Sequence, residues 1–411
     1  MENKIIPSGF GGSIVFKNGT TTMPLNQTIK PINPKMKKKI LIICSYDGSL
    51  ITFRGDFIQD LVKEGYSVYA AAPEMSSKVN EKIKEFGASP LSFQLKRTGL
   101  SPFSDIRSML QLKKIIQKHQ IDIVFPYTIK PVIYGSMAAN LSRTPVVSLI
   151  TGLGFTFTGI SLKARLLQSI AEFLYKISIQ KNKLVIFQNK DDAELFRKRN
   201  ILSNIQNTSV VNGSGVNLDR YSYRENTNTT GAVKFLFVAR LIREKGIHLY
   251  IEAAKMLKSK FPMAEFHIIG APDKSPSSIN IKDLTHFHDN GVVIYHGRQN
   301  NVSYFLGKSD IFVLPTYYRE GVPRSILEAL SVGLPIITTD SPGCRETVVG
   351  SENGKLISPG SLEELVGAMQ FFLENPSAIH QMGISSRELA EKKFDVKIIN
   401  KEIISSLNLH L

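Results

Sequence analysis

Apolar and polar residues alternate along this chain in two successive series. From Lys38 onward, short continuous apolar runs are separated by longer stretches in which apolar residues recur at helical spacing. Continuous apolar runs are typical of parallel strands buried on both faces, and the stretches between them are typical of covering helices. The first series contains KKILIICS, YSVYAAAP, IDIVFPY, PVVSLIT and LVIFQN, and the second contains VKFLFVAR, AEFHIIG, VVIYHG, DIFVLPT and LPIITTD.

A polar, glycine-rich segment at 210–231 separates the two series and is typical of a linker. We therefore predict an α/β protein with two Rossmann-like, doubly wound parallel-sheet domains, at 36–212 and 213–393, that face a central cleft. Residues 394–411 are expected to form a C-terminal helix that returns to the first domain. Residues 1–35 are rich in Asn, Thr, Pro and Gly without periodicity, so we predict disorder there, with Met36 as an alternative start.

The formal net charge is +16, and most of it lies in the first half of the chain. Residues 1–220 contain 30 Lys and Arg against 15 Asp and Glu, whereas the remainder contains 21 against 20. The first domain is therefore expected to face an anionic partner, unless the excess lysine only keeps the surface soluble. A nucleic acid is disfavoured as that partner because the sequence has no aromatic and basic RNA-binding motif.

Missing motifs disfavour several other classes of protein. No G-x-G-x-x-G follows the first strand, and the chain has no P-loop, H-E-x-x-H or C-x-x-C motif. The cluster HFHD at 286–289 is interpreted as a polar loop rather than a metal site. No D-x-D occurs to hold a metal-bound diphosphate, so we expect neither a metal nor a cofactor. Two cysteines and no apolar run of about 18 residues favour a cytoplasmic protein.

Two cations lie where the first strand of the second series ends. Arg240 closes the run VKFLFVAR, and Lys245 follows in LIREKG, just before the next predicted helix. Cations at the carboxyl edge of a parallel sheet can hold a diphosphate. The segment could also be an ordinary charged turn.

The segment EGVPRSILE, which begins at Glu320, predicts a loop that runs into a helix without a capping side chain. The amides near Arg324 and Ser325, with Gly321 just before them, can therefore hold a phosphate. Glu328 can accept hydrogen bonds from a ribose, and Glu320 from the hydroxyls of a sugar. Alternatively, Glu320 caps the helix and Arg324 pairs with Glu328 at i, i+4.

In combination these residues resemble the family 4 glycosyltransferases of the GT-B fold. EGVPRSILE matches the E-x7-E element of that family, and ALSVGLPIITTD and GCRETV follow it. The resemblance covers nearly all of 36–411 and implies a retaining, metal-free sugar transfer from a nucleotide sugar. It implies that Glu320 binds the donor sugar and Glu328 the ribose, while Arg240 and Lys245 bind the diphosphate. Glu320, Arg240 and Lys245 are the expected catalytic residues.

Two positions depart from the family pattern. Many relatives have a glycine where this chain has Pro323, so one potential phosphate-binding amide is missing. Relatives often have a histidine after the strand that IDIVFPY matches, whereas this chain has Thr128 and Lys130 there. No histidine role is therefore assigned.

Three segments, PYTIKPVIYG, LKRTGLSPFSD and LITGLGFTF, resemble a narrower group of transferases that extend undecaprenyl-diphosphate-linked glycans. This resemblance implies a polyprenyl-diphosphate-linked acceptor, and we assign Lys130 and Arg54 to binding it. Lys130 could instead be a surface lysine before a helix that begins at a proline. The run GLGF could allow a close backbone approach or could be a simple turn.

The predicted helix SLKARLLQSIAEFLYKI carries an apolar stripe flanked by basic residues. Such a stripe most often packs against a sheet, but it could also rest on an anionic membrane surface. The stripe comprises Leu162, Leu166, Ile170, Phe173 and Ile177, and the basic residues are Lys163, Arg165, Lys176, Lys181 and Lys183.

The sequence thus predicts a retaining glycosyltransferase that moves a hexose or N-acetylhexosamine from a UDP-sugar to a lipid-diphosphate-linked saccharide, in surface or protein-linked glycan biosynthesis. We expect it to be a peripheral protein at the cytoplasmic face of the membrane. One alternative is a transferase for a soluble acceptor. Another is a catalytically silent GT-B partner in a membrane assembly complex, against which the intact Arg240, Lys245, Glu320 and Glu328 argue.

Overall fold

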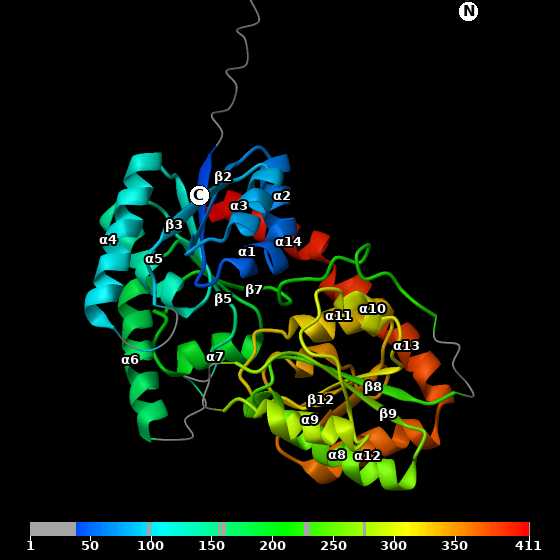
Figure 1. Ribbon diagram of the computed structural model, residues 1–411. Helices are drawn as coiled ribbons and strands as arrows, with labels where there is room; N and C mark the ends of the chain where they lie inside the picture. The colour runs from blue at the N-terminus through cyan, green and yellow to red at the C-terminus, as the bar shows by residue number, and fades with distance from the viewer. Residues whose placement is uncertain are drawn as a thin grey trace, which may run out of the picture. The chain divides into compact units, whose positions relative to one another are not determined.

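The computed structural model describes residues 38–96, 99, 101–154, 157, 162–225, 231–273 and 277–410, although not the side chains of 162–164 and 410. The predicted disordered extension at 1–35 lies outside the described residues. Within them the chain forms two successive β/α units, each built on a parallel sheet (Figure 1).

The first unit has the strand order β3-β2-β1-β4, and isolated parallel bridges continue this sheet into β5-β6-β7. The bridges join Val124 to Val146 and Tyr127 to Leu149. The strands are β1 (Lys39–Ile43), β2 (Ser67–Pro73), β3 (Ser89–Phe93), β4 (Ile123–Pro126), β5 (Val147–Ile150), β6 (Leu184–Phe187) and β7 (Thr208–Val210). The helices are α1 (Gly48–Thr52), α2 (Gly55–Lys63), α3 (Ser77–Glu85), α4 (Pro102–His119), α5 (Ile129–Leu141), α6 (Leu162–Ile179) and α7 (Lys190–Lys198).

The second unit has the strand order β10-β9-β8-β11-β12-β13, with α8 and α12 on one face of the sheet and α10, α11 and α13 on the other (Figure 1). Its strands are β8 (Lys234–Val238), β9 (Glu265–Ile269), β10 (Ile294–Tyr295), β11 (Ile311–Leu314), β12 (Ile336–Thr339) and β13 (Gly354–Ile357). Its helices are α8 (Ile247–Lys260), α9 (Ile281–Asp289), α10 (Val302–Leu306), α11 (Arg324–Val332), α12 (Leu362–Glu374) and α13 (Ser377–Leu389).

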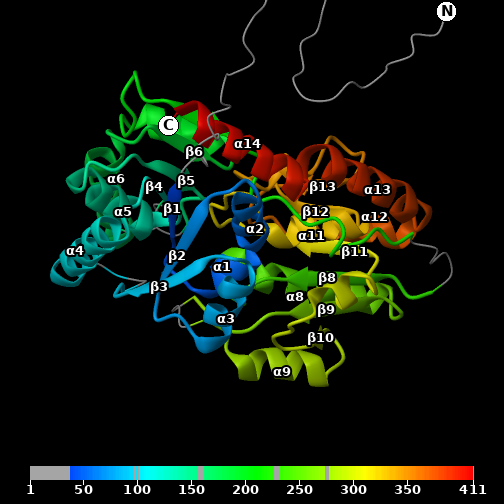
Figure 2. The same cartoon turned by 90° about the horizontal axis from the view of Figure 1, so that it is seen from above.

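The last helix, α14 (Val396–His410), packs against α2 of the first unit (Figure 2). Ile399, Ile403 and Leu407 are buried in the same apolar cluster as Ile40 and Phe57. Burial of these side chains removes apolar surface from water, so the C-terminal helix contributes to the stability of the first unit.

The doubly wound parallel sheets confirm the fold class, and every apolar run quoted above forms a strand. The pattern missed β3, β7 and β13, which are the outermost strands of their sheets. An edge strand has one side open to water and needs no continuous apolar run, so this signal is absent from it. The interpretation of HFHD as a loop is wrong, because these residues form the end of α9.

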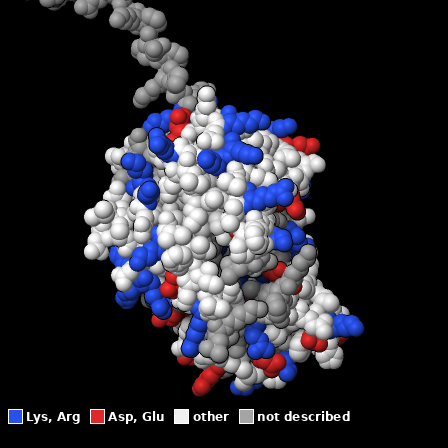
Figure 3. Space-filling model, turned by 90° about the vertical axis from the view of Figure 1, so that its left-hand side faces the viewer, with Lys and Arg blue, Asp and Glu red and all other residues white. Residues whose placement is uncertain are grey.

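Three residues of the apolar stripe of α6 are exposed and Ile170 is half-buried, so the interpretation of the stripe as core packing is wrong for these three; the side chain of Leu162 lies outside the described part of the chain. Leu166, Phe173 and Ile177 are exposed, whereas the buried side of α6 carries Ala171 and Tyr175. Helical periodicity marks a face of a helix but does not say what that face contacts. Figure 3 shows this side of the molecule, where uncharged surface is bordered by Lys and Arg side chains.

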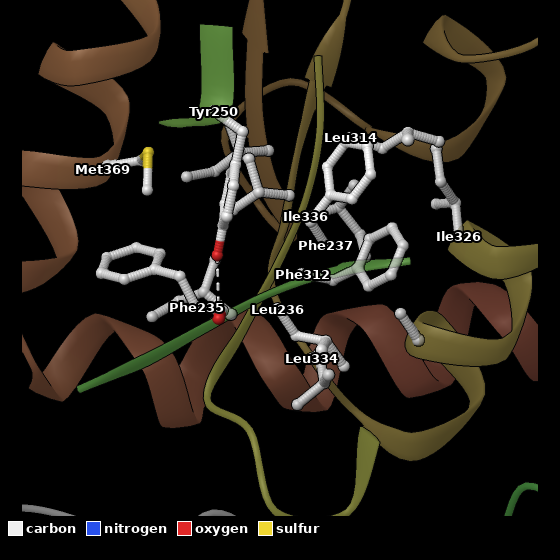
Figure 4. Packing of buried hydrophobic residues seen from close by; sticks show 14 of the residues in the cluster. Phe235, Leu236, Phe237, Tyr250, Phe312, Leu314, Ile326, Leu334, Ile336 and Met369 are labelled. Carbon is white, nitrogen blue, oxygen red and sulfur yellow. Dashed lines mark hydrogen bonds between the residues drawn. The ribbon is translucent and has the colours of Figure 1, made fainter. Parts of the chain in front are cut away.

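The core of the second unit lies on both faces of its sheet (Figure 4). Tyr250 and Met369 pack on one side of the central strands, and Ile326 packs on the other. The buried hydroxyl of Tyr250 donates a hydrogen bond to the carbonyl oxygen of Phe235, 3.0 Å away. This packing holds the strand ends that carry the candidate site in fixed positions.

Candidate active site

Each sheet reverses its strand order once, between β1 and β4 in the first unit and between β8 and β11 in the second. At such a point the connections leave in opposite directions and open a crevice at the carboxyl ends of the strands, where α/β proteins bind ligands. Arg240 and Lys245 follow β8, and Glu320 follows β11. These predicted site residues therefore lie at the reversal point of the second sheet.

The carboxylate of Glu320 accepts a hydrogen bond from the amine of Lys245 in an ion pair. Both side chains are largely buried, at 12% exposed for Lys245 and 14% for Glu320. Gly246, next to Lys245, lets the chain pass close to the backbone of Pro315, because a Cβ at Gly246 would lie 2.2 Å from the carbonyl oxygen of Pro315. Its φ of 81° is also in the left-handed region that favours glycine.

The ring of Tyr318 lies near both predicted diphosphate-binding cations. The cationic groups of Arg240 and Lys245 lie 5.7 Å and 5.4 Å from the centroid of its ring. Arg240 also donates to Asp273, with 2.6 Å between Nη1 and Oδ2. The sequence interpretation gave Tyr318 no role. Its only signal is its position two residues before Glu320, in a loop that follows a strand.

Helix α11 begins at Arg324, directly after Pro323, and no side-chain hydrogen bond caps it within the part of the chain that the structure describes. The predicted uncapped start is therefore observed, with Pro323 in an extended conformation at the cap position. The alternative interpretation of this segment had two parts, an Arg324–Glu328 pair and a helix cap by Glu320. The pair is observed, with Nε of Arg324 3.2 Å from the carboxylate of Glu328. The other part is wrong, because Glu320 pairs with Lys245 instead of capping the helix.

Residues of the first unit hold the backbone of the loop before α11. The side-chain amide of Asn189 donates to the carbonyl oxygens of Glu320, at 3.2 Å, and Gly321, at 3.0 Å. A Cβ on Gly152 would lie 2.3 Å from the amide nitrogen of Gly321. The GLGF run is therefore a place of close backbone approach, the first of the two alternatives weighed for it. Asn189 was missed, because only the fold brings it to this loop.

Asp192, in the first turn of α7, is buried beside the same loop, where its carboxylate accepts hydrogen bonds from Asn189 at 3.1 Å and from Arg319 at 3.3 Å. Burial raises the pKa of Asp192 to about 6, although Asn189 and Arg319 lower it. Because the unfolded carboxyl has a pKa of about 4, the folded state binds an extra proton between about pH 4 and pH 6.

The contribution of Asp192 to stability is therefore expected to fall as the pH rises through that range, by on the order of 3 kcal/mol. Urea unfolding of the wild type and of Asp192→Asn at pH 4 and pH 7 measures it. The free energy of unfolding of the wild type minus that of the variant should be smaller at pH 7 than at pH 4. A difference between the two proteins that does not change with pH would contradict the buried, titrating carboxyl.

The two residues predicted to bind the acceptor lie at the reversal point of the first sheet. Lys130, in the first turn of α5, forms an ion pair with the buried Asp105, at 2.8 Å, and Tyr134 donates to the same carboxylate. Lys130 is therefore not a surface lysine. Arg54 lies between α1 and α2, in the connection that leaves β1, and is fully buried. Binding of an acceptor by either residue stays a prediction.

Thr128, just before α5, has a φ of 68° and a ψ of 155°. Residues other than glycine rarely adopt this conformation, and such strain is found most often at functional sites. Its hydroxyl donates to Oγ of Ser45, 3.0 Å away, which follows β1. The strained residue thus joins the ends of the two strands between which the first sheet reverses.

Two family models match the chain. Residues 39–189 match the model described as glycosyl transferase 4-like, and residues 219–389 match the model described as glycosyl transferases group 1. The two matches follow the two β/α units and together cover most of the sequence.

Curated relatives resemble most of the chain. A Campylobacter jejuni N,N'-diacetylbacillosaminyl-diphospho-undecaprenol alpha-1,3-N-acetylgalactosaminyltransferase is 27% identical over 339 residues, which is 80% of this chain and 87% of that protein. An Escherichia coli UDP-Gal:alpha-D-GlcNAc-diphosphoundecaprenol alpha-1,3-galactosyltransferase is 26% identical over 66% of this chain and 71% of that protein. By their names, both relatives act on undecaprenyl-diphosphate-linked acceptors.

Solved structures share the fold. Sucrose-phosphate synthase from Thermosynechococcus elongatus superposes with a TM-score of 0.75 at 16% identity, over 91% of this chain and 99% of that one. Anabaena HepE in complex with UDP and glucose superposes with a TM-score of 0.72 at 17% identity, over 90% of this chain and 99% of that one. The protein is therefore a sugar-transferring enzyme with two Rossmann-like domains. Its two β/α units match the 4-like and group 1 glycosyltransferase models, and its fold is the GT-B fold of these structural neighbours.

Proposed function

We propose that the protein moves a hexose or N-acetylhexosamine from a UDP-sugar to a lipid-diphosphate-linked saccharide, with retention of the anomeric configuration. The observation that carries this proposal is the buried Lys245–Glu320 pair beside Arg240 and Tyr318, next to the uncapped start of α11. A UDP-sugar donor is supported by the name of the E. coli relative and by the ligands of HepE. The acceptor class is supported by the names of both relatives.

The proposed chemistry follows from the ion pairs of the two cations. Lys245 and Arg240 each contact a carboxylate, of Glu320 and of Asp273, and a donor diphosphate would compete for these cations. Charge develops on the diphosphate as its bond to the sugar breaks, and preorganised cations stabilise that charge. Glu320, adjacent to Lys245, would then accept hydrogen bonds from the sugar hydroxyls. In this proposal the side-chain cations take the role that a metal has in other transferases.

The test is transfer to extracted lipid-linked oligosaccharide from a panel of UDP- and GDP-sugars, with and without EDTA. We expect one UDP-sugar to be used, full activity in EDTA, and a product with the same anomeric configuration as the donor by NMR. Transfer only from a GDP-sugar, complete loss in EDTA, or an inverted product would each overturn the corresponding part of the proposal.

We further propose that the first unit binds the anionic membrane surface from which a polyprenyl-linked acceptor extends. The binding surface is the α4/α6 face, formed by exposed apolar residues of two helices that both pack against α5. Phe103 is 91% exposed, Leu166 63% and Phe173 61%. Large apolar side chains on a surface are typical of sites that contact a membrane or a protein. The apolar residues of the α4/α6 face are Phe103, Ile106, Leu110, Leu166, Phe173 and Ile177.

Basic residues on the same helices favour an anionic membrane over a protein partner as the occupant. Arg107, Lys114 and Lys118 are exposed on α4, and Lys176 is exposed on α6. Each basic side chain near an anionic bilayer contributes about 1 kcal/mol to binding. No helix in the described ranges is long and apolar enough to cross a membrane.

Binding to anionic vesicles is therefore expected to be strong at low salt and to weaken as the Debye length falls to about 8 Å at physiological salt. Flotation assays measure it, comparing the wild type with Arg107, Lys114, Lys118 and Lys176 changed together to Gln. The matched control changes four exposed lysines of the second unit, Lys255, Lys260, Lys282 and Lys308. Loss of binding in the first variant alone is expected. Equal binding by all three proteins would refute this surface while leaving the donor chemistry intact.

A further inference from the structure

Arg54 is a buried cation without a counter-ion in the described part of the chain. It immediately precedes α2, only 1% of it is exposed, and its Nε and Nη1 have no hydrogen-bond partner there. Its guanidinium lies over the ring of Tyr127, 5.3 Å from the centroid. Burial raises the pKa of the Tyr127 hydroxyl well above its ordinary value, so this phenol is neutral at pH 7 and does not balance the charge.

Arg324 also has a buried N–H group without a hydrogen-bond partner among the described residues. Its side chain is only 9% exposed, and Nε pairs with Glu328, but Nη1 is buried and has no partner among the described residues. The side chain starts from the first residue of α11, where the amides of Arg324 and Ser325 have no capping side chain. Unpaired N–H groups of a helix start and of a buried guanidinium both need an acceptor.

The two guanidiniums influence each other. The pKa of Arg54 is lowered to about 10, chiefly by burial; Tyr127 opposes this lowering, and the positive charge of Arg324 adds to it by a smaller amount. Each arginine lies in the connection that leaves a strand at the reversal point of its own sheet, Arg54 between α1 and α2 after β1, and Arg324 at the start of α11 after β11. Two buried like charges with vacant donors are stabilised by one anion that accepts hydrogen bonds from both.

We propose that Arg54 and Arg324 together bind a single phosphate group of a substrate, one arginine from each β/α unit. This inference rests on the proposed function, and it joins two residues that the sequence assigned to different substrates. The phosphate belongs either to the UDP-sugar or to the lipid diphosphate, because each offers a tetrahedral phosphate whose two non-bridging oxygens share one negative charge. Lysine would not replace arginine here, because only the guanidinium fork gives two parallel N–H donors.

The test is calorimetric titration of the full chain with UDP and, separately, with geranyl diphosphate. The variants are Arg54→Met, Arg324→Met and the double variant, with Arg199→Met as the control for loss of an exposed arginine. We expect each single variant to lose about tenfold or more in affinity for one of the two ligands. The losses should not add in the double variant, because both side chains bind one group. The control should bind both ligands as the wild type does.

Stability of the ligand-free protein distinguishes this role from a structural one. Because Arg54 is buried and unpaired, Arg54→Met should keep or raise the Tm, whereas a packing role predicts a fall. If Arg54→Met does not fold, Arg54→Lys keeps the charge and should still lose affinity for the same ligand. Loss for UDP assigns the phosphate to the donor, and loss for geranyl diphosphate assigns it to the acceptor. Unchanged affinity for both would overturn the proposal, and a wild type that binds neither ligand would overturn the proposed function with it.

Discussion

Changing Glu320 to Gln is expected to lower turnover about a hundredfold or more, on the order of 2.7 kcal/mol of lost transition-state stabilisation. Gln keeps the size of the side chain but removes the charge that holds the buried amine of Lys245. Lys245→Ala is expected to have an effect of the same size, because the cation would no longer face the departing diphosphate. The double variant should cost little more than either single variant, since the two residues act as a unit.

Steady-state kinetics with the donor sugar measure this effect, and circular dichroism at the assay temperature checks that each variant is folded. The matched control is Glu265→Gln, an ion-paired glutamate at the amino end of β9, on the opposite edge of the same sheet. Glu328→Ala should instead raise KM more than it lowers kcat, because a ribose is held alike in ground and transition states. Near-normal turnover of Glu320→Gln would remove this residue from the proposed mechanism.

Changing Gly343 to Ala is expected to lower turnover on the order of a hundredfold, although residue 343 belongs to a different loop from Glu320. A Cβ at this position would lie 1.8 Å from the carbonyl oxygen of Gly321, so one of the two loops must move. The segment that moves most directly carries Glu320, and a misplacement of about 1 Å in an active site costs about a hundredfold in rate. The Tm should fall as well, because the φ of 78° is strained for alanine.

Gly350→Ala is the matched control for this strain. Gly350 also has a positive φ, at 53°, but a Cβ there would meet no atom within 4 Å. The control should therefore lose stability by about 1 kcal/mol, with turnover unchanged. If Gly343→Ala and Gly350→Ala behave alike in kinetics, contact with the Glu320 loop is not what makes residue 343 important.

Local patterns predicted the positions of the residues that we assign to the donor, although their binding of a donor stays a prediction. The uncapped start of α11 could be read from Gly321, Val322 and Pro323, since none of these side chains can accept a hydrogen bond from a helix amide. The positions of Arg240 and Lys245 after β8 follow from the order of elements alone. What these cations contact did not follow, because Asp273 and Glu320 come from other loops of the sheet edge.

In the first unit, too, the sequence predicted the position of a residue but not its contacts. Lys130 was predicted at the correct strand end, yet its partner Asp105 is on another helix and could not be identified from the sequence. Asn189 lies 131 residues before Glu320 in the chain and still fixes its carbonyl oxygen. No spacing rule connects residues so far apart. A pattern that extends over one helix or one strand therefore cannot predict contacts of this kind.

The sequence by itself determined which segments become buried strands and covering helices, because the hydrophobic period depends on neighbours only a few residues away. It also determined the residue types that follow each strand. The tertiary structure alone decided that the stripe Leu166, Phe173 and Ile177 faces outward, while Tyr175 on the same helix faces the core. It likewise decided that Arg54 is buried with no counter-ion among the described residues. The physical reason is the same in both cases, since the surroundings of a side chain depend on segments that are distant in the chain and adjacent only after folding.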